Sequence, residues 1–113
     1  MSQLETIRSA LLALHKALLE VVRREHERTH GRLPPQQFLD ALIRDPALSW
    51  LRPLTTLLVA IDEADDLASI VTELQQLLGA SSTPDEFQQR YAAALQASPE
   101  LAYEHGALMR ALR

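Results

Sequence analysis

The fold depends most on residues 45–66, which read DPALSWLRPLTTLLVAIDEADD. This stretch holds the only Trp of the chain, two of its six prolines, one Arg between apolar neighbours and the densest run of acidic residues. Elsewhere, apolar residues recur at helical spacing with few interruptions. No catalytic or ligand-binding motif accompanies the stretch, so it informs the architecture before it informs the function.

The prolines of this stretch predict where helices begin. Asp45 followed by Pro46 is typical of an N-cap and a first helical position. Pro53 cannot donate a backbone hydrogen bond, so we expect a short helix, a bend at Arg52–Pro53, and a long helix to about residue 78. We expect Trp50 to anchor the core at that bend.

The apolar stripe changes face near the acidic run. The apolar residues before the run (Leu54, Leu58 and Ile61) and after it (Leu67, Ile70 and Leu74) lie on faces rotated by roughly 150°. Two interpretations are open: one helix continues and changes neighbours, or an Asp at 65–66 caps a new helix. We favour a continuous helix, because neither Gly nor Pro interrupts residues 54–78.

The N-terminal third predicts one long helix and one short helix. An apolar stripe at three- and four-residue steps runs from about Gln3 to about His30, and Ser2 with Glu5 has the spacing of a capping box. Gly31 and the two prolines that follow favour an end there. The short helix starts at Pro35, and its expected apolar stripe is Phe38, Leu39, Leu42 and Ile43.

The C-terminal third predicts a third long arm. Thr83 and Glu86 have the spacing of a capping box, with Pro84 at the first helical position. Ser98–Pro99 is typical of a second cap, but the apolar stripe keeps its phase across it. We therefore expect two nearly collinear pieces.

Three long arms and one short helix predict an all-α fold, an irregular antiparallel helical bundle. The chain has 113 residues, which is the length of one domain, and we expect residues 1–113 to form a single helical domain. A hydrophobic share of 47% with only three glycines fits helices around an apolar core.

Charge and composition argue against several classes of function. The net charge of −4 disfavours nucleic acid as a partner, and the basic residues 23–32 are interpreted as a solvated helix end. No Cys is present, and no apolar run approaches the length of about 20 residues that a membrane span requires. The first turns do not resemble a signal peptide, so we expect a cytoplasmic protein without membrane contact.

Five polar residues on or beside apolar stripes are the candidate binding residues: Glu25, Arg52, Asp62, Asp65 and His105. Burying an unpaired polar group is costly, so such residues can mark an internal polar cluster. In that cluster Arg52 would pair with Glu25 or with the acidic run, and His105 would donate to a carboxylate. The simpler interpretation is that each is solvated or satisfied where it stands.

One metal-type pattern occurs in the sequence: residues 26–30 read HERTH, which has His-Glu-x-x-His spacing. His26 and His30 have a spacing that can hold a metal on one helix face, but no third ligand can be assigned. Glu27-x-x-His30 is the single Glu-x-x-His in the sequence, whereas the di-iron bundle pattern needs two, and no nucleophile elbow, phosphate-binding loop or dinucleotide-binding glycine pattern occurs. We predict no metal, no cofactor and no enzymatic activity.

Three segments carry a resemblance. Residues 45–63 contain D-P-x-x-x-W-L-R-P-L followed by I-D-E, residues 14–19 read LHKALL, and residues 102–106 read A-x-x-H-G. Together they resemble a group of small bacterial helical proteins that have no assigned activity. The resemblance spans most of the chain and implies a compact cytoplasmic helical protein, without a cofactor or a catalytic residue.

We therefore expect a non-enzymatic interaction or regulatory protein that binds itself, as a homodimer, or another protein. The face change after Ile61 would let one half of the long helix pack internally and the other half against a second chain. The alternative is a small-ligand or metal-binding bundle that uses the inward-facing candidate residues. Metal analysis and thermal-shift measurements would separate the two.

Overall fold

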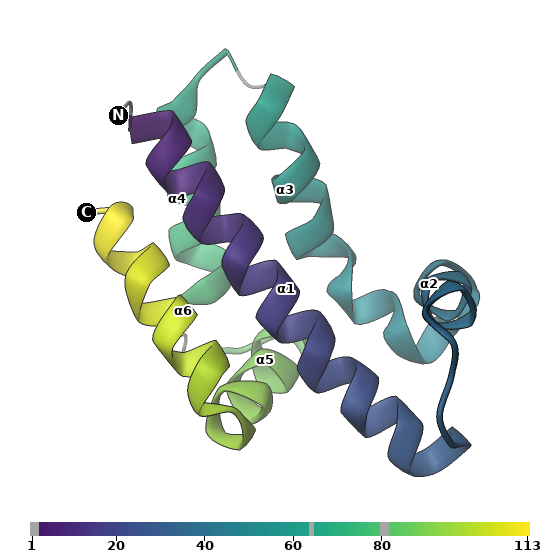
Figure 1. Cartoon of the computed structure of the whole chain (residues 1–113). Coiled ribbons are helices and arrows are strands. Elements are labelled where there is room, and N and C mark those ends of the chain that lie inside the picture. Colours follow the sequence, from purple (N-terminus) through teal and green to yellow (C-terminus); the bar gives the residue numbers. More distant parts are fainter. Residues whose placement is uncertain (1–2, 64, 80–81) are drawn as a thin grey trace.

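The computed structural model describes residues 3–63, 65–79 and 82–113, which form an all-α helical bundle (Figure 1). Within these ranges the order of elements is α1 (Gln3–His30), α2 (Pro35–Arg44), the 3-10 helix η1 (Pro46–Leu51), α3 (Arg52–Glu63), α4 (Leu67–Leu78), α5 (Glu86–Ala97) and α6 (Pro99–Ala111). This confirms the predicted fold class. The proposed Ser2 cap lies outside the described residues.

Helix α1 is the centre of the bundle and has the predicted bounds. It packs against α6 along much of its length and against α3 and α5 elsewhere. Gly31 follows it with a φ of 82°, in the left-handed region that a glycine reaches without strain. The long unbroken helix therefore ends where the sequence predicted it would.

Helices α1 and α3 run antiparallel, with a register fixed by two polar contacts. Arg8 Nε lies 2.8 Å from Asp62 Oδ1, and His15 Nε2 lies 3.2 Å from Thr55 Oγ1. The two contacts are seven residues apart on each helix, which corresponds to about two turns. This register places Leu12 on the same level as the turn of α3 that carries Val59.

The expected continuous helix through residues 62–66 is wrong. Helix α3 ends at Glu63, and α4 starts at Leu67 and returns alongside α3 (Figure 1). Asp66 is the N-cap: its Oδ1 accepts a hydrogen bond from the Ala68 N–H at 3.0 Å, and its Oδ2 accepts one from the Ser69 hydroxyl at 2.8 Å. The alternative, in which an Asp caps a new helix, is confirmed.

The change of apolar face therefore does not point to a second chain. Because the chain reverses after Glu63, the rotated face of α4 meets the same core as α3. Ile70, Leu74 and Leu78 are all buried within the chain. The interpretation that this half of the helix packs on a partner is wrong.

The last arm is also bent rather than collinear. Ser98 ends α5 and caps α6, and its Oγ accepts a hydrogen bond from the Leu101 N–H at 3.1 Å. The axis of α5 turns sharply away from that of α6 at this residue (Figure 1). The capping box of α5 lies two residues later than predicted, formed by Asp85 and Gln88.

Helix α2 lies at the edge of the bundle, where it packs mainly on η1 (Figure 1). Pro35 is at its first turn, and Asp45 caps η1 by accepting a hydrogen bond from the Ala47 N–H at 2.9 Å. Of its expected apolar stripe only Phe38 is buried, whereas Leu39 and Ile43 are 57% and 64% exposed. The apolar periodicity of α2 is typical of a helix that packs in a core, but the neighbouring elements of the chain do not cover all of its apolar face.

One hydrophobic core joins the helices. Its fully buried large side chains come from α1, α3, α4 and α6: Ile7, Leu11, Leu14, Leu18, Leu54, Ile61, Leu74, Leu101 and Leu108. Trp50 is half-buried against this core, with its ring 5.7 Å from that of Phe87. Among the described residues, no helix combines the length and the apolar character needed to cross a membrane.

Candidate functional site

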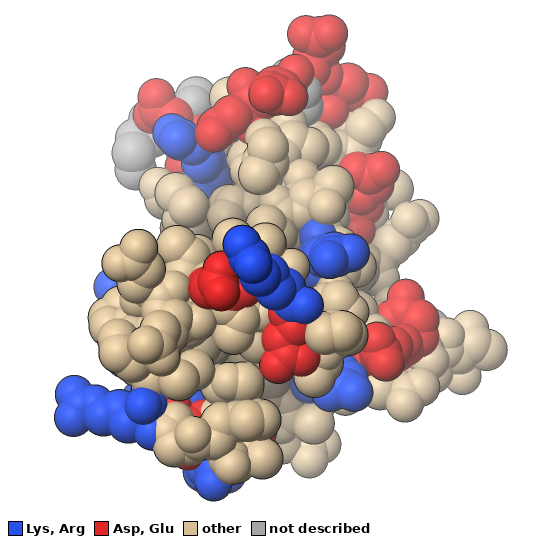
Figure 2. Space-filling view, turned by 90° about the vertical axis from the view of Figure 1, so that its right-hand side faces the viewer, with Lys and Arg blue, Asp and Glu red and all other residues tan. Residues whose placement is uncertain are grey.

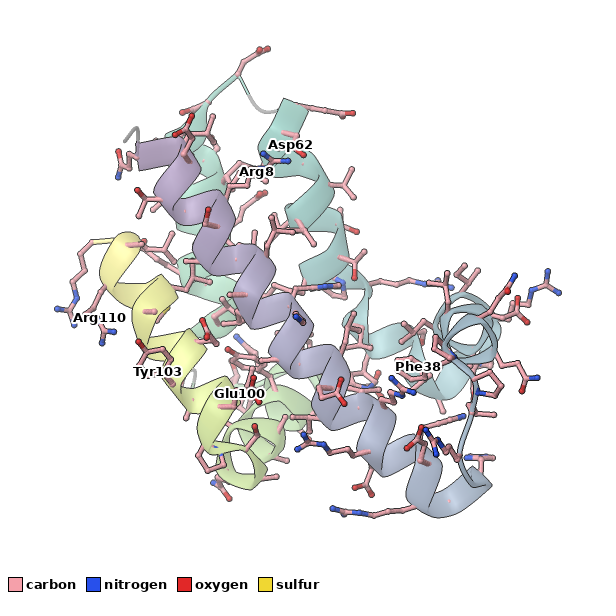
Figure 3. The ribbon with its side chains drawn as sticks, viewed as in Figure 1. Arg8, Phe38, Asp62, Glu100, Tyr103 and Arg110 are labelled. Atoms are coloured by element: carbon pink, nitrogen blue, oxygen red, sulfur yellow. The ribbon has the colours of Figure 1, made fainter. Side chains whose placement is uncertain are left out.

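The five predicted binding residues do not come together. Glu25 Oε2 pairs with Arg28 Nη1 at 3.0 Å, one turn along the same helix, rather than with Arg52. Asp62 pairs with Arg8 across the α1–α3 seam (Figure 3), and Asp65 is exposed in the connection to α4. Of the two interpretations, the internal polar cluster does not form among these residues, and each is solvated or paired where it stands.

Arg52 has no ion-pair partner among the described residues, although we expected a carboxylate beside it. Its side chain is exposed and lines a groove between α1, α2 and α3. An exposed guanidinium without a partner keeps its hydration and its charge available. Arg52 thus belongs to the surface of the molecule and not to its interior.

His105 has a partner of another kind than predicted. The Tyr91 hydroxyl lies 2.8 Å from His105 Nδ1, which joins α5 to α6. Burial lowers the pKa of His105 and raises the pKa of Tyr91 well above its usual range. Both groups are therefore neutral at physiological pH, and a hydroxyl donating to an imidazole nitrogen is a structural contact.

The exposed large apolar side chains gather on one face. Six such side chains occur in the described part of the chain, namely Leu4, Leu12, Leu39, Ile43, Val59 and Tyr103. Leu4 and Leu12 lie one turn before and one turn after Arg8, on the line of α1 that borders α3. We call the surface that carries Leu4, Leu12, Leu39, Ile43 and Val59 the α1/α2/α3 face. Only Tyr103, on α6, lies apart from it (Figure 3).

A groove of 400 Å³ lies at the α2 end of this face. Its walls come from α1, α2, η1 and α3, and apolar side chains form most of the lining: Leu19, Leu39, Leu42, Ile43, Leu48 and Leu51. His15, Arg52 and Thr55 supply its polar atoms. An apolar groove with few polar groups suits the apolar side chains of another chain.

His15 is held in a fixed orientation at the edge of this groove. The Thr55 hydroxyl donates to the Leu51 carbonyl at 3.3 Å, so its oxygen is free to accept from His15 Nε2. Burial lowers the pKa of His15, which favours the neutral ring. The groove therefore presents an uncharged imidazole at neutral pH.

The two ends of α3 carry opposite charge. Arg52 lies at the groove end, whereas Glu63 and Asp65 lie at the other end, where α3 leads into α4. All three are exposed, and none forms an ion pair within the described part of the chain. Figure 2 looks onto the side of the molecule where α2 and α3 lie and shows acidic side chains gathered at its upper end, with most of the Lys and Arg below.

A second groove of 490 Å³ runs between the C-terminal half of α1, η1 and α5. Glu25, His26, His30 and Arg90 lie at its polar edge, and Trp50 is part of its apolar wall. The Arg90 guanidinium lies 6.0 Å from the centre of the Trp50 ring. This groove combines an apolar wall with a cation, as sites for small apolar anions do.

The described residues do not assemble a metal site. No group of three potential His, Asp or Glu ligands occurs among them. His26 and His30 stack with ring centres 4.3 Å apart, and His30 Nδ1 lies 3.3 Å from the His26 carbonyl oxygen. The two rings therefore stack on each other at the end of α1.

Sequence reasoning missed the α1/α2/α3 face. Leu12 and Val59 lie outside the main apolar stripes of their helices. On α1 the sequence did carry a signal for this face, because a second apolar line, Leu4–Leu12–Leu19, runs beside the core stripe.

Comparisons with family models, with curated proteins and with solved structures each find no match for this chain. The resemblance to small bacterial helical proteins stays a prediction.

Proposed function

We propose that the chain is a non-enzymatic interaction protein and that the α1/α2/α3 face is its binding surface. The observation that carries the proposal is the clustering of five of the six exposed large apolar side chains on this one face. Scattered apolar side chains are ordinary on a protein surface, but a contiguous set marks a place where another surface packs. A cytoplasmic location, expected from the sequence, is part of this proposal.

The position of α2 supports the proposal. A ten-residue helix is marginal on its own in water, and most helical stability comes from packing of an apolar face. Here Phe38 is buried, whereas Leu39 and Ile43 remain open beside the groove. A partner on this face would complete the packing of α2.

Photo-crosslinking from Val59 tests the proposal. With p-benzoylphenylalanine in place of Val59, we expect a discrete adduct in cells that make the protein. We expect the adduct to disappear when I43E is added, since a buried carboxylate would oppose docking. The same crosslinker at Tyr103, which is exposed on α6 away from the face, is the matched control. Equal adducts from both positions, or none from Val59, would refute the proposal.

A second candidate function is suggested by the groove between α1 and α5. Arg90 lies over the Trp50 ring and is only loosely paired, with its Nε 3.9 Å from Glu86 Oε2. A carboxylate with an apolar tail would place its charge at Arg90 and its tail along the wall.

Decanoate and decanol offer matched probes for this groove. Decanoate should raise the melting temperature of the protein, and decanol, which shares the tail but lacks the charge, should not. The R90Q variant should lose the response to decanoate. An equal response of the wild type to both probes, or no response, would remove this candidate.

A further inference from the structure

We infer that the partner on the α1/α2/α3 face is a second copy of this chain, related by a two-fold axis that passes close to Val59. The inference rests on the proposed function and names the partner of that same surface. It is argued from the distribution of charge along the face and from the positions of its apolar side chains.

The charge pattern of the face is complementary to itself. Along α3 and its end, the unpaired cation Arg52 lies at one end and the unpaired carboxylates Glu63 and Asp65 lie at the other. A two-fold axis through the middle of the face places the cationic end of each copy against the acidic end of the other copy. The same patch then serves both copies, as in an isologous dimer.

The register on α3 agrees with such an axis. Val59 is seven positions after Arg52 and four positions before Glu63, the last residue of α3. If two copies of α3 pack antiparallel with Val59 opposite Val59, Arg52 of each copy lies about 10 Å from the axis at a rise of 1.5 Å per residue, toward the acidic end of the other copy, where Glu63 ends α3 and Asp65 follows. Two equivalent ion pairs therefore form around one apolar centre.

The apolar side chains follow the same symmetry. Leu12 is on the same level as the turn of Val59, so both lie near the axis. Leu39 and Ile43 lie at the groove end, whereas Leu4 lies near the acidic end. The axis brings α2 of one copy over the Leu4 end of the other, so each exposed apolar side chain of the face finds cover.

A parallel arrangement of the two copies is disfavoured. It would place Glu63 and Asp65 against the same carboxylates of the second copy and Arg52 against Arg52. Like charges brought together at an interface oppose association, whereas complementary ends fix the orientation. The charge pattern thus selects one relative orientation of the two copies.

Sedimentation equilibrium at low salt with charge-reversal variants tests the inference. We expect a monomer–dimer equilibrium for the wild type, a dissociation constant about tenfold or more higher for R52E, and recovery toward the wild-type value for R52E/D65R. R110E, which reverses an exposed cation on α6, is the matched control and should not change the constant (Figure 3). Circular dichroism melting confirms that each variant is folded.

The outcomes separate this inference from the proposed function. A strict monomer together with a Val59 adduct to a different protein would overturn the second-copy inference and leave the proposed function standing. A strict monomer with no Val59 adduct would overturn both. A dimer that R52E does not weaken, or that R52E/D65R does not recover, would overturn the two-fold arrangement.

Discussion

The Tyr91 hydroxyl lies 2.8 Å from His105 Nδ1, although 14 residues separate the two along the chain. On one straight helix, residues that far apart would be separated by about 21 Å. The contact therefore records how sharply α5 and α6 fold against each other at Ser98.

Removing the Tyr91 hydroxyl should destabilise the fold moderately. Y91F keeps the ring packed beside Phe87, 5.5 Å away, but removes the donor to His105. We expect a loss of about 1 kcal/mol in the free energy of unfolding, measured by urea denaturation. Y103F, on the exposed ring of α6, is the control; equal effects of the two changes would mean that the contact contributes nothing.

Acidification should destabilise the protein through His15 and His105. Burial lowers the pKa of both below the usual value of 6.5. The unfolded chain therefore binds protons first as the pH falls through 6.5, so stability is full above that pH and declines below it until the folded-state histidines are protonated. Urea unfolding between about pH 7.5 and pH 5 measures the decline.

The variants H15Q and H105Q identify the source of this pH dependence. Each variant should lose part of the decrease in the free energy of unfolding at low pH, because a glutamine does not titrate. If the free energy of unfolding of the wild type rises on acidification over the same pH range, the predicted direction of the pH dependence is wrong.

The turn between α3 and α4 should depend on the cap at Asp66. Its two carboxylate oxygens accept from the Ala68 N–H and the Ser69 hydroxyl. D66A should cost about 1 kcal/mol in the free energy of unfolding, whereas D66S, which keeps a capping oxygen, should cost less than half of that. Equal losses for D66A and D66S would show that the turn is held by packing alone.

Two glycines should respond to alanine in opposite directions. Gly31 has a φ of 82°, so G31A should destabilise the protein by about 1 kcal/mol. Gly106 lies inside α6, and an added Cβ would meet only the mobile end of Arg110 at 3.4 Å. G106A should therefore stabilise by about 0.5–1 kcal/mol. The melting temperatures of both variants test this prediction, which is wrong if the two temperatures shift in the same direction.

Local signals predicted most helix boundaries. The prolines at 35, 46 and 99 and the left-handed Gly31 act within one turn of the chain, so the sequence alone was enough to place them. The turn at Asp66 was misjudged, because a helix of this composition can either continue or be capped. Which of the two occurs is decided by whether α4 buries its apolar face on the same core.

The direction of each helix was harder to predict than its extent. The apolar stripe keeps its phase across Ser98, but phase describes rotation about an axis and not the angle between two axes. For the same reason the apolar stripe expected on α2 did not show that Leu39 and Ile43 would be exposed. Periodicity predicts that one face of a helix is apolar, but it does not predict which element packs against that face.

The candidate site could not be predicted from polar residues alone. Glu25, Asp62 and His105 each found a local partner, so their places on apolar stripes reflected pairing and not convergence. The α1/α2/α3 face depends on which helices become neighbours, and this is set by the connection through α2 and η1 that returns α3 alongside α1. Only then do Leu12 and Val59 come to lie on one surface.

The distance between two spin labels on α3 tests the two-fold arrangement most directly. The chain contains no Cys, so T56C takes a single nitroxide beside Val59 on the outer side of α3. With helices packed at about 10 Å and a rise of about 1.5 Å per residue, the arrangement predicts a narrow band of label-to-label distances within about 30 Å. Y103C should give longer distances. No dipolar coupling at T56C in concentrated protein, or a shorter distance at Y103C, would contradict it.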